Sequence, residues 1–240
     1  MTRPAEASCH GAAPDAPSAT GPDAPPTTDV ALAALRAASS PRGGGLDVPK
    51  PEIDALAKGW RAACPDLAAR LALAEGLWAT GLREPRLAAA HLLVQARIPG
   101  DAPAWALILR WVEGLDDPIV ADEVAKAGAR RLVADPSRLD AVAPWADAHR
   151  PPEIRRAALA FTLPWSKTSH PSSEDLARRK RVLDWAGALA GAPERRVRNA
   201  LSAWLRSLAK RDPERVRAFL ATHDYAFAPP VRQEVAAVLR

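Results

Sequence analysis

Most residue patterns that would indicate a known enzyme chemistry are missing from this sequence. Its five histidines, at positions 10, 91, 149, 170 and 223, have no metal-ligand spacing. The two cysteines, Cys9 and Cys64, are too few for a disulfide framework or a zinc site. The motifs GxGxxG, GxxxxGKS/T, HExxH and GxSxG do not occur. We therefore expect no metal and no cofactor, and we interpret His91, which precedes two leucines, as a packed histidine.

Among the carboxylates, Asp122 stands in a context that predicts its exposure. Asp117 and Pro118 have the residue types of a helix N-cap and first position. Val120 marks the buried face of that helix, and at about 100° per residue Asp122 points about 200° away from it. Its side chain should face solvent or the concave side of a curved array, where a fixed carboxylate can stabilise positive charge. The alternative is a solvated acid paired with Lys126 four residues later.

Positive charge is concentrated in the C-terminal part of the chain. The whole sequence has 33 Lys and Arg against 28 Asp and Glu, and its pI is about 9.7. Residues 1–150 carry a net charge of −3, whereas residues 151–240 carry +8. An excess confined to one part of the chain favours a basic surface for a polyanion. Arginines outnumber lysines 27 to 6, which suits phosphate contacts but is also typical of a GC-rich coding sequence.

The elements that must position these residues are helices. Apolar residues make up 48% of the sequence, alanine and leucine dominate, and β-branched runs are scarce, which favours helix over strand. Residues 1–27 are rich in Pro, Ala, Ser and Asp without a periodic apolar face, and we expect a disordered tail there. Residues 28–240 are expected to form a single domain. Helices are predicted from Asp29 to Ala38, from Pro51 onward, and over 66–79, 83–97, 101–113, 118–134, 136–148, 152–164, 173–190, 193–210, 213–222 and 229–239.

An internal repeat predicts how these helices are arranged. The segment DPSRLDAVAPWADAHRPPEIRRAAL begins at Asp135, and the similar segment DPERVRAFLATHDYAFAPPVRQEVAAVL begins 77 residues later at Asp212. Pro193 follows Pro152 by 41 residues, near the period of about 40 residues that is typical of HEAT and armadillo units. Such units bury their apolar faces only against their neighbours. The sequence therefore predicts an all-α, HEAT-like α-solenoid with a concave basic face.

Four stretches of the chain resemble the DNA alkylation repair family of HEAT-like DNA glycosylases. They are LDVPKPEIDALAK (46–58), LREPRLAAAHLLVQ (82–95), the segment from DDPIVADEVA to EIRRAALAF (116–161), and RRVRNALSAWLRSLAKRDPERVRAFL (195–220). They follow one another in the order and spacing of the family. In that family, HEAT-like repeats hold duplex DNA on a basic concave face, and an Asp assists cleavage of the N-glycosidic bond of alkylated purines.

This resemblance implies roles for individual residues. Asp122 matches the catalytic Asp, which would stabilise an oxocarbenium-like sugar while a cationic N3- or N7-alkyl purine leaves. Arg156 matches the Arg that holds DNA on the next concave helix, with Arg155 as its neighbouring competitor. A surface arginine and a solvated acid remain the alternatives for these positions.

The aromatic positions of the family are matched less well. Trp204 corresponds to an aromatic near the lesion, yet it shares an apolar helical stripe with Val197 and three leucines, so core packing is an equal alternative. Arg198, one residue past Val197, is a candidate phosphate contact. The segment Pro118–Ile119 stands where the family commonly has a tryptophan, and Trp111 is the upstream aromatic that could replace it.

Three functions are consistent with these features. The first is a metal-free glycosylase that acts on duplex DNA with alkylated bases. The second is a catalytically inactive DNA-binding protein that recognises distorted or branched DNA, and the third is a protein-interaction scaffold. No apolar run approaches the roughly 18 residues of a membrane span, and the N-terminus has no secretory apolar region. We expect a monomer in the cytoplasm, associated with the nucleoid and not with a membrane.

Overall fold

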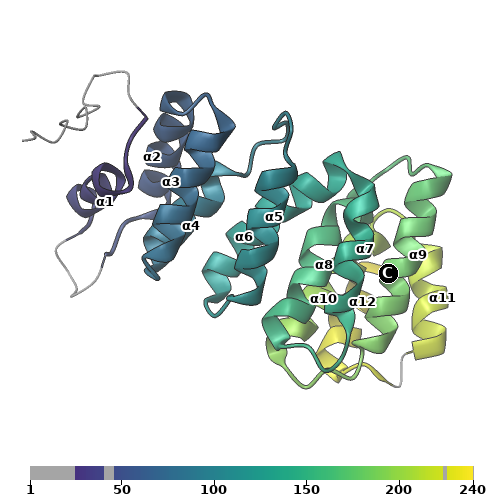
Figure 1. Ribbon diagram of the computed structural model, residues 1–240. Helices are drawn as coiled ribbons and strands as arrows, with labels where there is room; N and C mark the ends of the chain where they lie inside the picture. The colour runs from purple at the N-terminus through teal and green to yellow at the C-terminus, as the bar shows by residue number, and fades with distance from the viewer. Residues whose placement is uncertain (1–24, 41–45, 224–225, 240) are drawn as a thin grey trace, which may run out of the picture.

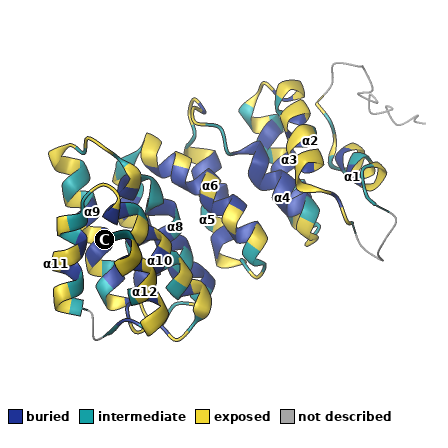
Figure 2. Cartoon of the chain, turned by 180° about the vertical axis from the view of Figure 1, so that it is seen from behind, coloured by how far each residue is buried: buried dark blue, intermediate teal, exposed yellow. Residues whose placement is uncertain are grey.

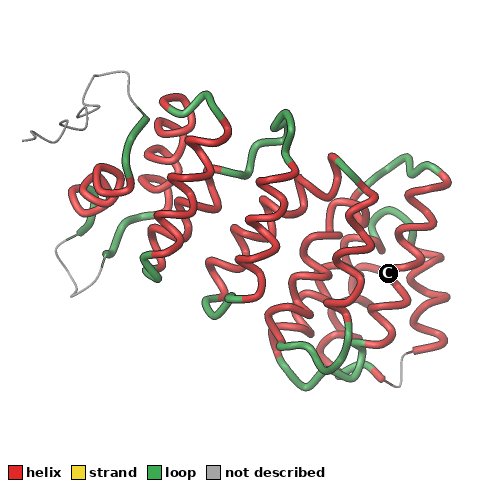
Figure 3. Tube along the Cα trace, in the orientation of Figure 1, coloured by secondary structure: helices red, strands yellow, loops and turns green. Residues whose placement is uncertain are grey.

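The computed structural model describes residues 25–40, 46–223 and 226–239, and within these ranges it contains helices and no strand (Figures 1 and 3). The all-α prediction is confirmed. The predicted disordered tail lies almost wholly outside the described residues. The helices are α1 (Thr28–Ala37), α2 (Lys50–Ala63), α3 (Leu67–Ala79), α4 (Arg83–Leu92), α5 (Ala102–Glu113), α6 (Pro118–Ala134), η1 (Pro136–Arg138), α7 (Leu139–Val142), η2 (Ala143–Ala146), α8 (Pro152–Lys167), α9 (Ser173–Ala188), α10 (Arg195–Ala209), α11 (Pro213–His223) and α12 (Pro229–Leu239).

The helices form an elongated array with two layers (Figure 1). In one layer the even-numbered helices pack against one another in chain order, from α2 through α4, α6, α8 and α10 to α12. The other helices cover this layer, with α3 on α4, α5 on α6, η2 and α9 on α8, and α11 on α10. Buried residues lie along the helices of both layers (Figure 2), and they form one hydrophobic cluster whose members range in the sequence from Ala31 to Val235. None of the helices within the described ranges is long and apolar enough to cross a membrane.

The start of α6 is fixed as the sequence predicts. Oδ1 of Asp117 accepts hydrogen bonds from the backbone N–H groups of Ile119 at 2.8 Å and Val120 at 3.2 Å, and Pro118 occupies the first helical position. Arg83 at the start of α4 donates from Nε to Oδ2 of Asp117 at 2.6 Å. Burial raises the pKa of Asp117, but the bonds from Arg83 and the two N–H groups outweigh it and lower the pKa below its ordinary value. This cap orients the helix that carries Asp122.

Two predicted boundaries near the N-terminus are wrong. The cap of α1 is Thr27, whose hydroxyl accepts from the N–H of Val30 at 3.4 Å, so Asp29 lies inside the first turn. The helix predicted over 83–97 ends at Leu92. Two of the carbonyl groups that follow this helix end, those of Gln95 and Ala96, accept hydrogen bonds from the guanidinium of Arg131 on α6 instead of from helix N–H groups.

Prolines explain two further differences. The helix predicted over 136–148 is divided into η1, α7 and η2; Pro144 cannot donate the backbone bond that would continue α7 as a regular helix. The helix predicted to stop at Pro164 instead continues for almost one turn. Trp165 is buried in the core, and this packing favours the extra turn despite the hydrogen bond that Pro164 cannot make.

Buried arginines fasten neighbouring helices to one another. Arg131 is fully buried, and its Nη1 donates to Asp101 at 2.9 Å. Arg179 on α9 is also buried and donates from Nε to the carbonyl of Trp165, at the end of α8, at 2.8 Å. A guanidinium group has five donors in a fixed plane, so it satisfies several carbonyl groups at a helix end at once. Arginines used in this way are not available to a polyanion.

Candidate functional site

The surface of α6, α8 and α10 is hollowed by two adjoining grooves. The larger groove, of about 730 Å³, lies between α6 and α8, and its lining includes Asp122, Lys126, Arg130 and Lys167. The smaller groove, of about 380 Å³, lies between α6, α8 and α10, and its lining includes Asp122 and Arg156. Asp122 therefore stands where the two grooves meet.

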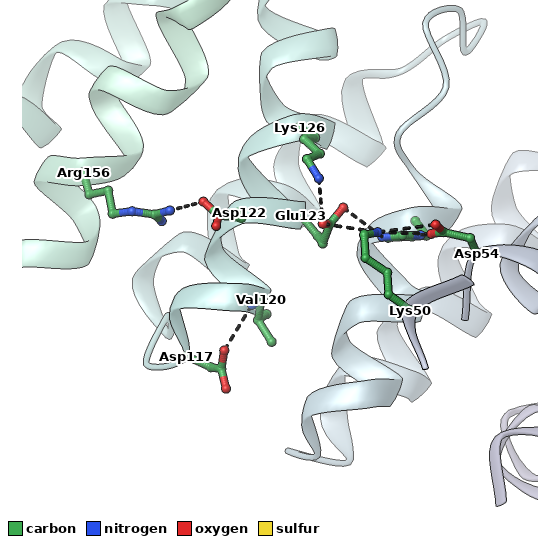
Figure 4. Close-up of polar contacts among 9 residues, drawn as sticks. Lys50, Asp54, Asp117, Val120, Asp122, Glu123, Lys126 and Arg156 are labelled. Carbon is green, nitrogen blue, oxygen red and sulfur yellow. Dashed lines mark hydrogen bonds and ion pairs between the residues drawn. The ribbon is translucent and has the colours of Figure 1, made fainter. Parts of the chain in front are cut away.

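Asp122 is exposed on the face of α6 opposite Val120, as its position in the helix predicts. Its side chain is 59% exposed, and Oδ1 accepts a hydrogen bond from Nη2 of Arg156 on α8 (Figure 4). The predicted alternative, a pair between Asp122 and Lys126, is wrong, because Nζ of Lys126 donates to Glu123 at 2.7 Å. The carboxylate of Asp122 is thus bound to a neighbouring helix and still open to the groove.

The two adjacent arginines of α8 have different surroundings. Arg156 reaches the groove, where its guanidinium contacts Asp122 and lies 3.9 Å from Oε2 of Glu153. Arg155 is buried, and its Nη2 donates to Glu194 at 2.6 Å. Of the two candidates for a DNA contact, only Arg156 faces the groove.

Arg198, the other arginine candidate, lies on neither groove. Its side chain is half-buried, and its Nη1 donates to the carbonyl groups of Ala192 and Pro193 at the start of α10. A contact with a phosphate group would require Arg198 to leave these carbonyls.

The two tryptophan candidates lie in the core. Trp204 is fully buried on α10. The apolar stripe therefore predicted its position correctly, whereas the resemblance implied a contact with the lesion. Trp111 is 2% exposed on α5, in the other layer, and stacks on Trp78 with ring centroids 4.5 Å apart. Neither residue is part of the lining of the two grooves, so neither can shelter a base there without rearrangement of the core.

A buried charged network beside Asp122 was missed by the sequence analysis (Figure 4). Glu123 is 5% exposed, and its carboxylate lies 2.8 Å from Nε2 of His91 on α4 and 3.4 Å from Nζ of Lys50 on α2. Nδ1 of His91 contacts Asp54 on α2. His91 is therefore packed, as interpreted, but as a bridge between two acids, and no spacing along the chain could reveal this because three helices contribute.

The network determines the charge state of Glu123. Burial raises the pKa of its carboxyl group, but hydrogen bonds from His91 and Lys126, together with their positive charge, lower it from 4.5 to about 2. Glu123 is thus a buried carboxylate that ties α6 to α2 and α4, one residue from Asp122.

The arrangement suits binding of an anion beside a site of developing positive charge. Arg156 can hold a phosphate group through its fork of donors, and the exposed carboxylate of Asp122 can stabilise a cation in the same groove. Arg196 lines the smaller groove, with its Nη1 2.5 Å from Glu153.

The chain was compared with models of protein families and with curated proteins. The model of the family described as DNA alkylation repair enzyme matches residues 44–237 of the chain. A search of curated proteins found no significant match.

Proposed function

Because the chain belongs to the DNA alkylation repair enzyme family, we propose that it is a metal-free glycosylase that excises alkylated bases from duplex DNA. Residues 28–240 are proposed to form a single HEAT-like solenoid whose even-numbered helices are the DNA-facing layer. The ordered packing of these helices against one another supports this arrangement. The grooves on α6, α8 and α10 are the proposed site.

The proposed reaction breaks the bond between C1′ of the sugar and the purine nitrogen. Alkylation at N3 or N7 gives the purine a positive charge, so the base leaves as a neutral molecule that keeps the electron pair of the broken bond. The sugar passes through an oxocarbenium-like state, which the carboxylate of Asp122 stabilises electrostatically. Water then adds to C1′, and its proton passes to solvent. These steps need a fixed carboxylate and a bound substrate.

Arg156 is proposed to act in binding. Its guanidinium restrains the Asp122 side chain and lines the smaller groove, from which a phosphate group of the DNA backbone can reach it. The observation that carries the proposal is this pair: an exposed carboxylate and an arginine from the next helix, brought together at the junction of two grooves.

The test is release of free methylated base from methylated duplex DNA by the wild type and by Asp122→Asn. We expect release by the wild type only, with DNA affinity largely retained in the variant. Asp140→Asn is the matched control, because Asp140 is an exposed acid on α7 that pairs with Arg181 at 2.9 Å, away from the grooves. If Asp122→Asn loses DNA binding as well as base release, the lost activity would follow from the lost binding, and Asp122 would have no catalytic role.

A second candidate is a DNA-binding protein without catalysis that recognises distorted or branched DNA. The burial of Trp111 and Trp204 favours it, because no aromatic side chain is among the described residues that line the grooves. Pro118 or Ile119 occupies the place of the family's tryptophan. A cationic base then has no π face to contact. Salt-dependent binding without base release from any alkylated duplex would support this candidate.

A further inference from the structure

The larger groove has an apolar floor that the proposed chemistry does not use. Ile119 and Val133, near the two ends of α6, are each 47% exposed, and both line this groove. Leu163 and Pro164 of α8 form the facing wall. Only two other large hydrophobic residues in the described ranges are comparably exposed, Val30 and Leu82, and they lie elsewhere. The groove thus runs along α6 past Asp122, and most of its apolar floor lies between Asp122 and the C-terminal end of the helix.

The rim of this groove carries two positive charges that pair with no acid in the described part of the chain. Arg130 on α6 and Lys167 at the end of α8 are exposed and line the groove, and within the described part of the chain neither makes an ion pair or a side-chain hydrogen bond. This distinguishes them from Lys126 and Arg156, which pair with Glu123 and Asp122. Two unpaired cations over an apolar floor fit a partner with regularly placed negative charges and an uncharged face between them.

We propose that one sugar–phosphate strand of the duplex lies in the α6–α8 groove, with its phosphate groups at Arg130 and Lys167 and its deoxyribose rings against the apolar floor. This inference rests on the proposed DNA binding and adds the direction in which the DNA leaves the site. Asp122 lines the groove near one end of α6, so the strand that carries the lesion can enter it directly. A protein segment is disfavoured because it would have to supply acids spaced along an apolar strip.

The length of α6 gives the extent of the contact. Arg130 follows Asp122 by eight residues, and at about 1.5 Å per residue the two lie about 12 Å apart along the helix. For a duplex whose axis runs parallel to α6, DNA rises about 3.4 Å per nucleotide along that axis, so the phosphate at Arg130 belongs to a nucleotide about three or four positions from the lesion. The footprint of the protein is therefore expected to reach at least that far on one side.

The experiment compares the wild type with Arg130→Ala/Lys167→Ala in binding to a fluorescent duplex across a range of salt concentrations. Each phosphate contact contributes about 0.9 to the slope of log K against log salt, so the double variant should lose about two units of slope. Lys180→Ala/Arg181→Ala removes the same charge from α9, in the other layer, and should leave the slope nearly unchanged. Val133→Ser should weaken binding without changing the slope, because it alters only the floor.

A second measurement tests the position of the contact. A duplex that ends two base pairs beyond the methylated base on one side should bind the wild type no better than it binds Arg130→Ala/Lys167→Ala. Both replaced side chains are exposed, so folding should be unaffected. Equal thermal unfolding midpoints of the variant and the wild type would confirm this.

The possible outcomes separate this inference from the proposed function. DNA binding by the wild type with an unchanged slope in Arg130→Ala/Lys167→Ala would refute the strand path and leave the proposed function standing. If Lys180→Ala/Arg181→Ala lowers the salt slope as much as Arg130→Ala/Lys167→Ala does, total charge and not the groove determines DNA affinity. That result would also overturn the inference. Failure of the wild type to bind duplex DNA at low salt would refute both.

Discussion

The substitution Glu123→Gln changes the buried charge beside Asp122 while keeping the shape of the side chain. In the wild type the carboxylate of Glu123 accepts from His91 at 2.8 Å and from Lys126 at 2.7 Å. The glutamine amide can accept one of these bonds, but it has no charge to balance the ammonium groups of Lys126 and Lys50. Because these partners come from three helices, their loss should loosen α6 from α2 and α4.

The magnitude follows from the pKa of Glu123. Folding lowers this pKa from 4.5 to about 2. At about 1.4 kcal/mol per pKa unit, the ionised form contributes about 3 kcal/mol to the free energy of unfolding near neutral pH. Removal of one partner from a buried ion pair costs a similar amount, about 3–5 kcal/mol. We expect Glu123→Gln to be less stable than the wild type by about 3 kcal/mol at pH 7.

The pH dependence has a definite sign. Since the pKa of Glu123 is lower in the folded state than in the unfolded state, the stabilisation is fully present above pH 4.5 and is lost as the pH falls toward 2. The wild type and Glu123→Gln should therefore differ most near neutral pH and converge in acid.

The assay is urea unfolding followed by circular dichroism at pH 7 and at acid pH. Glu214→Gln is the matched control, because Glu214 is 83% exposed, pairs with Arg217 at 2.6 Å, and should contribute about 1 kcal/mol or less. An unfolding free energy of Glu123→Gln equal to that of the wild type at pH 7 would refute the reasoning. So would a difference that persists undiminished at low pH, because the stabilisation would then not come from the ionised carboxylate.

Two further substitutions test the packing that supports the site, both by urea unfolding. Trp204→Ala should lower the free energy of unfolding by about 3–5 kcal/mol, because Trp204 is fully buried and leaves a cavity; a loss below about 1 kcal/mol would contradict its role in the core. Gly128→Ala should also destabilise, by about 1–2 kcal/mol, because the new methyl group on α6 meets the buried ring of Phe161 on α8 and this overpacking outweighs the gain in helix propensity; a variant more stable than the wild type would show that the ring can move.

The features that local geometry determines could be predicted from the sequence. Asp117 caps α6 and Asp122 is exposed because both outcomes depend only on residue type and on helical periodicity within a few residues. The burial of Trp204 follows from its apolar stripe in the same way. Helix ends were less predictable where a distant side chain, such as Arg131, takes the carbonyls of a loop.

The charged network could not be predicted, because its members are far apart in the sequence. His91 is separated by more than 30 residues from Glu123 and from Asp54, and only the packing of α4 between α2 and α6 brings the three together. A histidine followed by two leucines is typical of a packed position, and nothing near it in the chain indicates two acid partners. The pair between Asp122 and Arg156 likewise depends on α6 lying against α8, and only the resemblance suggested it.

The distribution of arginines changes how the basic charge of residues 151–240 should be interpreted. Several of these arginines are engaged within the protein: Arg179 bonds to helix-end carbonyls, and Arg155 is buried against Glu194. Net charge therefore overstates the surface available to a polyanion, and the useful quantity is the number of exposed cations that lack an acid partner. Two cations of this kind, Arg130 and Lys167, line the α6–α8 groove. One of the two, Arg130, belongs to residues 1–150, whose net charge is negative. The proposed binding surface is therefore not confined to the basic residues 151–240.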